Sequence, residues 1–173
     1  MSAEHSEQSE QVEGLPDSCK NLIARLRGRF PGAVGEATTL RQCADELTVR
    51  VAREQIVEVC HFLKTDPQLA FDYLSDLSGV DYPDREKRFE VVYHLYSIPQ
   101  GHRVRLKVQV AEGEAVPTVT GVWRTADWHE REAYDLLGIP FEGHPDLRRI
   151  LLPDDWKGHP LRKEYPLAGY DGD

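Results

Sequence analysis

The chain has 173 residues, enough for a single domain with a sizeable core. Its 30 acidic residues outnumber its 21 basic residues, and the resulting formal charge of −9 argues against nucleic acid as the main partner. The 3 cysteines are far apart and cannot form a four-thiolate cluster, and no apolar run approaches the roughly 18 residues of a membrane span. We therefore expect a soluble, cytoplasmic protein, which could still be a peripheral subunit of a membrane complex.

The N-terminal part of the chain predicts a flexible tail, a helix and a strand. Residues 1–16 contain glutamates but no lysine or arginine, so we expect an acidic tail without fixed structure. A helix is predicted from residue 17 or 18 to the Pro-Gly pair at 31–32, because apolar residues follow at helical spacing. Apolar and polar residues then alternate over 46–51, which predicts a half-buried strand.

Two further helices are predicted next. Over residues 56–63 apolar side chains recur on one face of a second helix. Asp66 and Pro67 form a typical helix start, and Gly79 is placed as a helix stop. We therefore predict a third helix between them, with a buried face made of Leu69, Ala70, Tyr73, Leu74 and Leu77.

The clearest structural signal is a hairpin of two long strands. Apolar residues recur at every second position over 89–95 and again over 104–110, with Pro99-Gln-Gly101 between the two runs. The second strand turns Arg103, Arg105 and Lys107 to the face opposite its aliphatic side chains. We interpret this basic face as solvated surface, with a surface for an acidic partner as the alternative.

After the hairpin the sequence predicts a short strand over residues 119–123 and then a helix. Asp127 and Glu130 have the spacing of a capping box, and Gly138 and Pro140 end the helix. The order of elements, which includes no internal repeat, predicts an α+β domain over residues 17–138. In this domain helices pack on a mostly antiparallel sheet that contains the long hairpin.

The C-terminal residues 139–173 show no helical or alternating pattern. Their prolines exclude any long regular element, yet the segment is too apolar for a solvated tail. We expect an extended strap that docks on a surface, because the prolines reduce the entropy lost on docking. That surface belongs either to a partner or to the protein's own core. The apolar residues concerned are Ile150, Leu151, Leu152, Trp156, Leu161 and Tyr165.

The helix over residues 128–138 opens with a His-Glu pair, which invites comparison with zinc metalloproteases. Those enzymes need a second histidine four residues after the first, so that both rings face one ion. Four residues after His129 the chain has Ala133. A metal site built from His129, Glu132 and either His144 or His159 would need histidines from separate proline-bounded segments, and no spacing ties them together. No glycine-rich phosphate loop and no nucleophile elbow accompany it.

The charges of this helix have structural explanations. Arg131 and Asp135 are four residues apart, which predicts a favourable surface pair. Glu130 and Glu132 lie in the first turns, where the helix dipole favours acids. A second dense group of mixed charges occurs over residues 148–164, interleaved with leucines and a tryptophan. Such a mixture is more typical of a specific polar interface than of plain solvated surface.

The charged helix and the strap together resemble one known family. The run Glu130-Arg-Glu-x-x-Asp-Leu-Leu, followed by His144 and by residues 148–151, is similar to the signature of the C-type subunit of NADH-quinone oxidoreductase. This is the 30-kDa-type subunit of respiratory complex I. The resemblance continues through the proline-rich strap and covers residues 123–170, and the preceding hairpin and helices are compatible with it.

The resemblance implies a hydrophilic-arm subunit of the proton-pumping NADH:quinone oxidoreductase, needed for assembly and for electron transfer by the whole complex. The subunit would be peripheral, on the cytoplasmic side of the cell inner membrane, and packed against the large subunit that helps form the quinone site. It is expected to bind no cofactor and to catalyse nothing alone, with flavin and iron–sulfur clusters in partner subunits. The signature residues expected to hold the interface and the local fold are Glu130, Arg131, Glu132, Asp135, His144, Arg148 and Arg149.

Two alternatives remain open at this point. The first is the equivalent subunit of a related membrane-bound hydrogenase or ferredoxin:plastoquinone reductase, because these complexes use similar subunits. The second, of a different class, is a stand-alone metal-dependent hydrolase that uses His129 and Glu132.

Overall fold

The computed structural model describes residues 16–40 and 43–166, so the predicted acidic tail lies outside the described residues except for Pro16. Within these ranges the elements follow the order helix, two strands, helix, three long strands, short strand, helix, short strand. Their bounds are α1 Asp17–Arg29, β1 Val34–Leu40, β2 Cys43–Val51, the 3₁₀ turn η2 Arg53–Gln55, α2 Ile56–Thr65, β3 Tyr73–Asp81, β4 Phe89–Ser97, β5 His102–Val110, β6 Val116–Pro117, α3 Ala126–Leu137 and β7 Phe141–Glu142.

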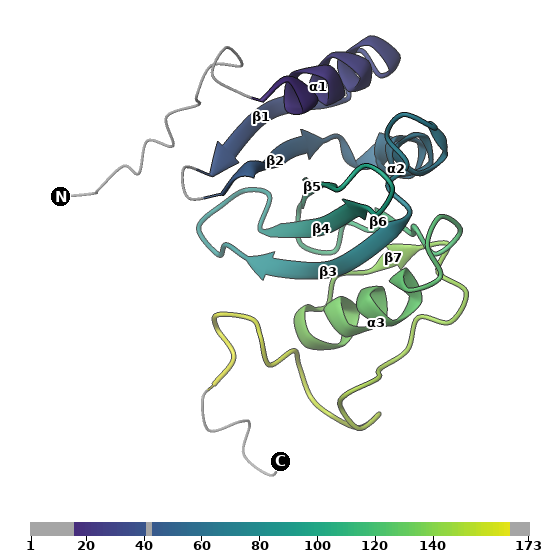
Figure 1. The fold of residues 1–173 in the computed structure, drawn as a ribbon. Coiled ribbons are helices and arrows are strands. Elements are labelled where there is room, and N and C mark those ends of the chain that lie inside the picture. Colours follow the sequence, from purple (N-terminus) through teal and green to yellow (C-terminus); the bar gives the residue numbers. More distant parts are fainter. Residues whose placement is uncertain (1–15, 41–42, 167–173) are drawn as a thin grey trace, which may run out of the picture.

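The five long strands form one twisted sheet in the order β1-β2-β5-β4-β3 (Figure 1). Only β2 and β5 run parallel, and the other neighbours are antiparallel. The hairpin predicted from alternation is confirmed as β4 and β5, which pair along their whole length from Phe89–Val110 to Ser97–His102. The predicted α+β class, with helices on a mostly antiparallel sheet, is confirmed.

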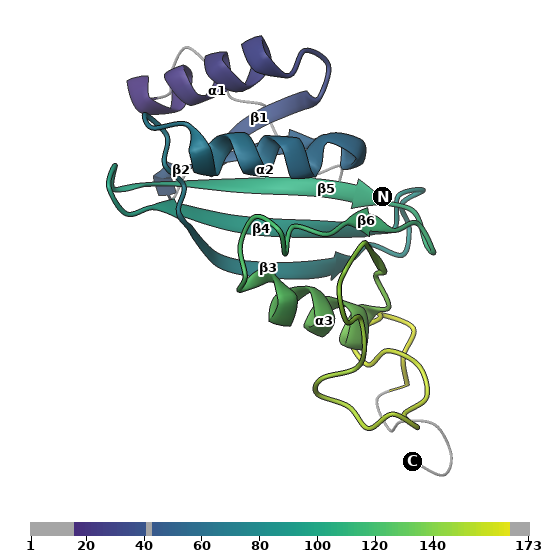
Figure 2. The same ribbon diagram turned by 90° about the vertical axis from the view of Figure 1, so that its right-hand side faces the viewer.

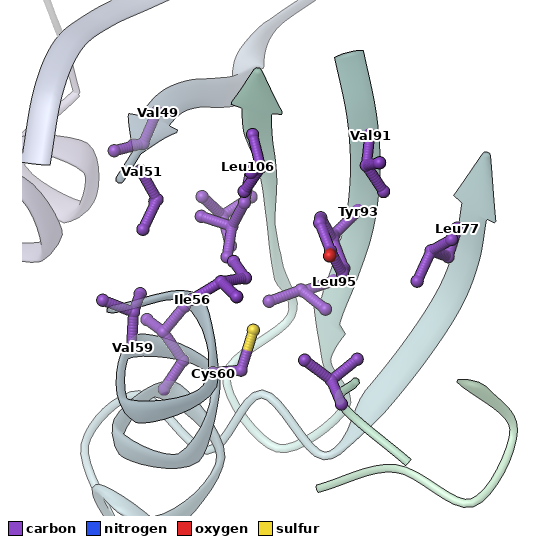
Figure 3. Packing of buried hydrophobic residues seen from close by; sticks show 14 of the residues in the cluster. Val49, Val51, Ile56, Val59, Cys60, Leu77, Val91, Tyr93, Leu95 and Leu106 are labelled. Atoms are coloured by element: carbon purple, nitrogen blue, oxygen red, sulfur yellow. The ribbon is translucent and has the colours of Figure 1, made fainter. Parts of the chain in front are cut away.

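The core lies between the sheet and the helices that cover one of its faces (Figure 2). The inward side chains of β5 are fully buried valines and leucine, as the alternating pattern predicted. Figure 3 shows Leu106 of β5 on the side of the sheet that faces Ile56, Val59 and Cys60 of α2. These residues are buried in α2, which confirms the second predicted helix and its buried face. Removing each such aliphatic side chain from water contributes about 1.5–3 kcal/mol.

The third predicted helix is wrong, because residues 73–81 form strand β3. A β-bulge between Leu74 and Asp76 shifts the phase of the strand, so Leu74 and Leu77 both face the core although they are three residues apart. The bulge therefore gives the two buried leucines the three-residue spacing that is typical of a helix. Asp66 does not start a helix either. Its carboxylate accepts the Gln68 amide at 2.9 Å and its carbonyl accepts the Leu69 and Ala70 amides, but the chain makes only this one turn, because Ala70 has φ 44° and leaves the helical conformation.

Two smaller features also differ from the sequence analysis. Residues 119–123 form hydrogen-bonded turns instead of the predicted strand, and a two-residue strand, β6, precedes them and pairs with β7. Strand β1 was not predicted from the sequence. It pairs with β2 in an irregular register with two shifts, which obscures the alternation expected of a regular strand.

The basic residues of β5 lie on the sheet face opposite the core. Lys107 forms an ion pair with Glu90 of β4 at 2.9 Å, and the Arg103 guanidinium lies over the ring of Tyr96, 5.4 Å from its centroid. Cross-strand partners on this face therefore account for much of its charge, in line with the interpretation as outer surface.

Candidate interface at helix α3 and the C-terminal segment

Helix α3 begins without the predicted capping box. Thr125 is the residue before the helix, and no side chain caps its first amides. Glu130 is fully buried, and its carboxylate accepts hydrogen bonds from the Thr118 hydroxyl at 2.5 Å and from the Val119 amide at 2.8 Å. The residue predicted to cap the helix instead ties it to the loop after β6.

Burial also changes the acidity of Glu130. Loss of solvation raises the pKa of this carboxyl to about 7, although the Thr118 and Val119 hydrogen bonds oppose the shift. The side chain of His144 is also fully enclosed, with its Nε2 atom 3.6 Å from a carboxylate oxygen of Asp127 and 4.0 Å from one of Glu130. His144 thus connects the start of α3 to the C-terminal segment.

Arg131 and Asp135 do not form the predicted surface pair. Arg131 is buried, and its guanidinium donates to the carbonyl oxygens of Arg148 and Arg149, each at 3.2 Å. Its charged group also lies 5.2 Å from the ring centroid of Trp128. The side chain therefore holds the backbone of the C-terminal segment against the helix.

Asp135 makes a second contact between α3 and the C-terminal segment, after that of Arg131. One oxygen of its buried carboxylate accepts the amides of three successive residues, 150–152, at 2.9–3.0 Å, and the other pairs with Arg149 at 2.7 Å. Burial would raise the pKa of this carboxyl, but these amides and the Arg149 guanidinium outweigh it and hold the pKa below its ordinary value. Arg149 in turn donates to the carbonyl groups of Trp156 and Gly158. One carboxylate thereby organises the loop that runs from Arg149 to Gly158.

The segment also covers the C-terminal end of α3. Gly138 ends the helix with φ 74°, as predicted. The His159 ring donates to the Asp135 carbonyl at 2.8 Å, the Arg162 side chain to the Leu137 carbonyl at 2.7 Å, and the Leu161 amide to the Leu136 carbonyl at 3.0 Å. Carbonyl groups that a helix end leaves unsatisfied are thus paired, and the Arg162 cation lies where the helix dipole favours it.

A third anchor was not predicted from the sequence. The buried carboxylate of Asp81, at the end of β3, accepts two hydrogen bonds from Arg88 and one from the Lys163 amide at 2.8 Å. Arg88 also pairs with Glu164, and the Arg88 bonds are the main reason that the pKa of Asp81 lies below its ordinary value. These groups come from distant parts of the chain, so no local pattern could bring them together.

The seven signature residues therefore divide into two groups. Glu130, Arg131, Asp135, His144 and Arg149 are turned inward. The last four hold the segment to α3, whereas Glu130 ties the helix to the loop after β6, as the distances above describe. Glu132 is exposed, and the Arg148 side chain is 70% exposed and pairs only with the neighbouring Asp146 among the described residues.

Large apolar side chains project from the same region. Of the apolar residues after Glu142, only Leu147 packs against the main core within the described part of the chain. Trp128 of α3 is 61% exposed, Leu151 60% and Leu161 55%. We call these three residues together with Glu132 and Arg148 the α3–strap face. This set combines exposed apolar side chains with charged ones, which is the composition of a protein interface.

The residues of the hydrolase alternative are not brought together. His144 lies against Asp127 near the start of α3, whereas His159 lies against Asp135 and the ring of Tyr134 near its end. In the described ranges no three histidine, cysteine, aspartate or glutamate side chains form a group that could hold a metal ion. The buried Cys60 thiol has a pKa raised far above its usual value, mainly by desolvation, so it is unsuited to nucleophilic chemistry. Among residues 16–40 and 43–166, no helix is both long and apolar enough to cross a membrane.

Comparisons with known proteins agree with this description. A family model described as respiratory-chain NADH dehydrogenase, 30 Kd subunit, matches residues 49–171. The chain is 51% identical over 160 residues to the C-type subunit of NADH-quinone oxidoreductase from Geotalea uraniireducens, which covers 91% of this chain and 94% of the relative. It is 60% identical over 148 residues to a C-type subunit of NADH-quinone oxidoreductase from Rhizobium meliloti, covering 86% and 80%.

Two solved structures share the fold. The trypsin-resistant fragment of Nqo5 is 37% identical and superposes with a TM-score of 0.59 over 74% of this chain and 98% of the fragment. A chain of the membrane-bound sulfane sulfur reductase, an archaeal respiratory membrane complex, superposes with a TM-score of 0.71 over 87% of this chain and 86% of that one. At 24% identity the second likeness concerns the fold alone.

Proposed function

The chain belongs to the family of 30 kDa subunits of respiratory-chain NADH dehydrogenase, and from that premise we propose that it is a structural subunit without a reaction of its own. In this proposal it binds no cofactor, and partner subunits carry the flavin and the iron–sulfur clusters. It lies on the cytoplasmic side of the membrane as a peripheral subunit. Its partner at the α3–strap face is the large subunit that helps form the quinone site.

The proposal rests on one observation about the C-terminal segment: its backbone is bound to α3, whereas two of its large apolar side chains are exposed. Buried charges of α3 bind the backbone of the segment, at Asp135 through three amides and at Arg131 through two carbonyl groups. The apolar side chains of Leu151 and Leu161 stay in solvent. A chain that needed the segment only for its own core would bury these leucines, because each exposed one forgoes about 1.5–3 kcal/mol.

The internal contacts also explain how docking can be strong. A free segment would lose conformational entropy when it binds, at roughly 1–2 kcal/mol for each residue that becomes ordered. Here the segment is already ordered by its contacts with α3, so its conformational entropy is lost during folding and not on binding. The signature charges therefore serve the interface indirectly, by holding the shape that presents the apolar side chains.

The proposal is tested by placing charges on the face without disturbing its internal contacts. The double variant Leu151→Asp with Leu161→Asp should keep the fold, since both side chains are exposed, but a charge in an apolar interface is costly. We expect the variant to be lost from the membrane complex and membrane NADH:quinone oxidoreductase activity to fall at least tenfold.

Ile98→Asp is the matched control, because Ile98 is 63% exposed but lies in the turn between β4 and β5. It should assemble normally. Assembly of the double variant at wild-type level would refute the docking role of the α3–strap face.

A further inference from the structure

The outer face of the sheet, opposite the core, carries a group of basic side chains. Arg103, Arg105 and Lys107 project from β5 on this face and are at least partly exposed, and Arg50 of β2 is the register partner of Lys107. The helices cover the other face of the sheet (Figure 2). We call these four residues the basic sheet face. They concentrate positive charge on a chain whose formal charge is −9.

A recess lies at one end of the basic sheet face. It measures about 220 Å³ and lies where the start of β1, the end of β2 and β5 meet. Its lining includes the cations Arg50, Arg53, Lys87 and Lys107. Glu54 is the one acid in this lining, and it pairs with Arg53 at 3.0 Å. The recess therefore offers a net positive charge to an incoming carboxylate.

Contacts within the sheet neutralise part of this charge and leave part of it in place. Lys107 pairs with Glu90 of β4 at 2.9 Å. The Arg103 guanidinium lies over the neutral ring of Tyr96, 5.4 Å from its centroid. Such a contact orients an arginine without removing its charge. Arg103, which is exposed, can therefore still attract an anion.

Complementary negative charge occurs in the segment before α1. Residues 1–15 contain Glu4, Glu7, Glu10 and Glu13 but no lysine or arginine, and they lie outside the described residues. Segments with a single sign of charge often serve as interaction segments. The sequence analysis left an acidic partner open for the basic residues of β5, and this segment has the required charge.

The acidic residues are long enough as a segment to reach the basic sheet face. Helix α1 begins at Asp17 and lies beside β1 at the edge of the sheet (Figure 1). β5 is two strands further in, about 10 Å from β1. The chain between Glu4 and Pro16 can extend over as much as about 40 Å. The segment can therefore pass the sheet edge and lie along β5.

Covalent attachment favours this contact although each exposed ion pair contributes little by itself. A segment of the same chain is held near the face at an effective concentration in the millimolar range. It loses less translational freedom on docking than a separate peptide would. Several weak ion pairs can then act together.

We propose that the acidic residues 4–13 of this chain dock on the basic sheet face. The docked segment occupies the surface that an anionic partner would use, so such a partner has to displace it. This contact lies on the sheet face opposite the core, and it is independent of docking by the α3–strap face.

Nuclear magnetic resonance of the full chain tests the contact from the side of the segment. The quadruple variant Glu4→Gln, Glu7→Gln, Glu10→Gln and Glu13→Gln leaves every described residue unchanged. It should shift the backbone amide signals of residues 103–107. Raising the salt concentration from about 0.01 M to 1 M should remove most of the difference from the wild type, because the screening length falls from roughly 30 Å to 3 Å.

The reciprocal variant tests the contact from the side of the sheet. Arg103→Gln removes one exposed charge of the basic sheet face and should shift the amide signals of residues 4–13. Arg148→Gln is the matched control, because it removes an exposed arginine from the α3–strap face. It should leave the signals of residues 4–13 unchanged.

Three results would overturn the proposal. The first is an equal response of residues 4–13 to Arg103→Gln and Arg148→Gln. The second is a quadruple variant whose signals over residues 103–107 match the wild type, or differ from it equally at low and high salt. The third is a shift that appears only as the protein concentration rises, because the segment would then dock on a second copy of the chain.

Discussion

At the scale of single residues, the inward-facing signature side chains act on backbone groups more than on each other. Asp135 accepts three consecutive amides and Arg131 donates to two consecutive carbonyl groups, so each charge fixes a stretch of chain. The sequence analysis singled out these residues but predicted a surface pair between them. Helical spacing predicts which side chains can meet on one helix. It does not predict that another segment of the chain will cover those side chains.

Replacement of Asp135 by asparagine tests the importance of that carboxylate. Asparagine has nearly the same shape, but it brings a donor toward amides and leaves Arg149 without its anion. We expect the free energy of unfolding, measured by chemical denaturation, to fall by about 3 kcal/mol, the usual cost of breaking a buried charge pair from one side. The exposed pair of Asp146 and Arg148 supplies the control, since Asp146→Asn should change little. If Asp135→Asn and Asp146→Asn lowered the free energy of unfolding equally, the buried Asp135 network would contribute no more to stability than an exposed ion pair.

Glu130 makes a distinct prediction for the pH dependence of stability. Its folded pKa of about 7 lies above the ordinary 4.5, so its stabilising contribution is complete below pH 4.5 and is lost as pH rises through 7. Glu130→Gln removes this loss. Relative to the wild type, we expect the variant to gain about 2.5 kcal/mol in unfolding free energy between about pH 5 and pH 8. If the difference in unfolding free energy between Glu130→Gln and the wild type stayed constant from pH 5 to pH 8, the raised pKa of Glu130 would be contradicted.

At the scale of elements, regular strands were predictable and irregular ones were not. β5 follows strict alternation because its aliphatic side chains are buried and those between them are at least partly exposed, and it pairs with β4 without a shift. β4 keeps apolar residues on the core face, although Glu90 and Val92 on its other face are buried as well. β3 carries a bulge that gives its inward leucines the spacing of a helix, and β1 has two register shifts. The same limit applies to the segment after Glu142. Its prolines predicted an extended course, but its contacts depend on Asp81 and Arg88, which are far away in sequence from Lys163 and Glu164.

Gly79 shows what β3 requires at its contact with α3. The sequence suggested a helix stop, but a Cβ atom here would lie only 2.8 Å from the Ile139 side chain and would also collide with Leu137. We therefore expect Gly79→Ala to lower the thermal and chemical stability by about 1–3 kcal/mol through overpacking.

Leu137→Ala alone also destabilises, because Leu137 is buried, but it removes one of the colliding side chains, so the loss in the double variant should be smaller than the sum of the two single losses. Gly121→Ala, at a position with no atom within 4 Å, should be nearly neutral. If the two glycine variants behaved alike, the close contact between β3 and α3 would not limit this position.

At the scale of the whole molecule, the fold separates a sheet domain from the α3–strap face, the contact surface that we propose. The helix-covered side of the sheet holds the main core, while the segment after β7 is held to α3 by polar and charged bonds and keeps its leucines in solvent. Membership of the 30 kDa subunit family places this arrangement in a respiratory complex. The family was recognisable from the spacing of its charges, but the way in which those charges shape the interface required the fold.

The most direct test of this account is photo-crosslinking in native membranes. A photo-reactive amino acid at position 151 or 161 should form an adduct with the large subunit of the quinone site, since both side chains belong to the α3–strap face. The same probe at position 98, which is equally exposed but lies in the hairpin turn, should not. Adducts with that subunit from position 98 and none from 151 or 161 would contradict the account.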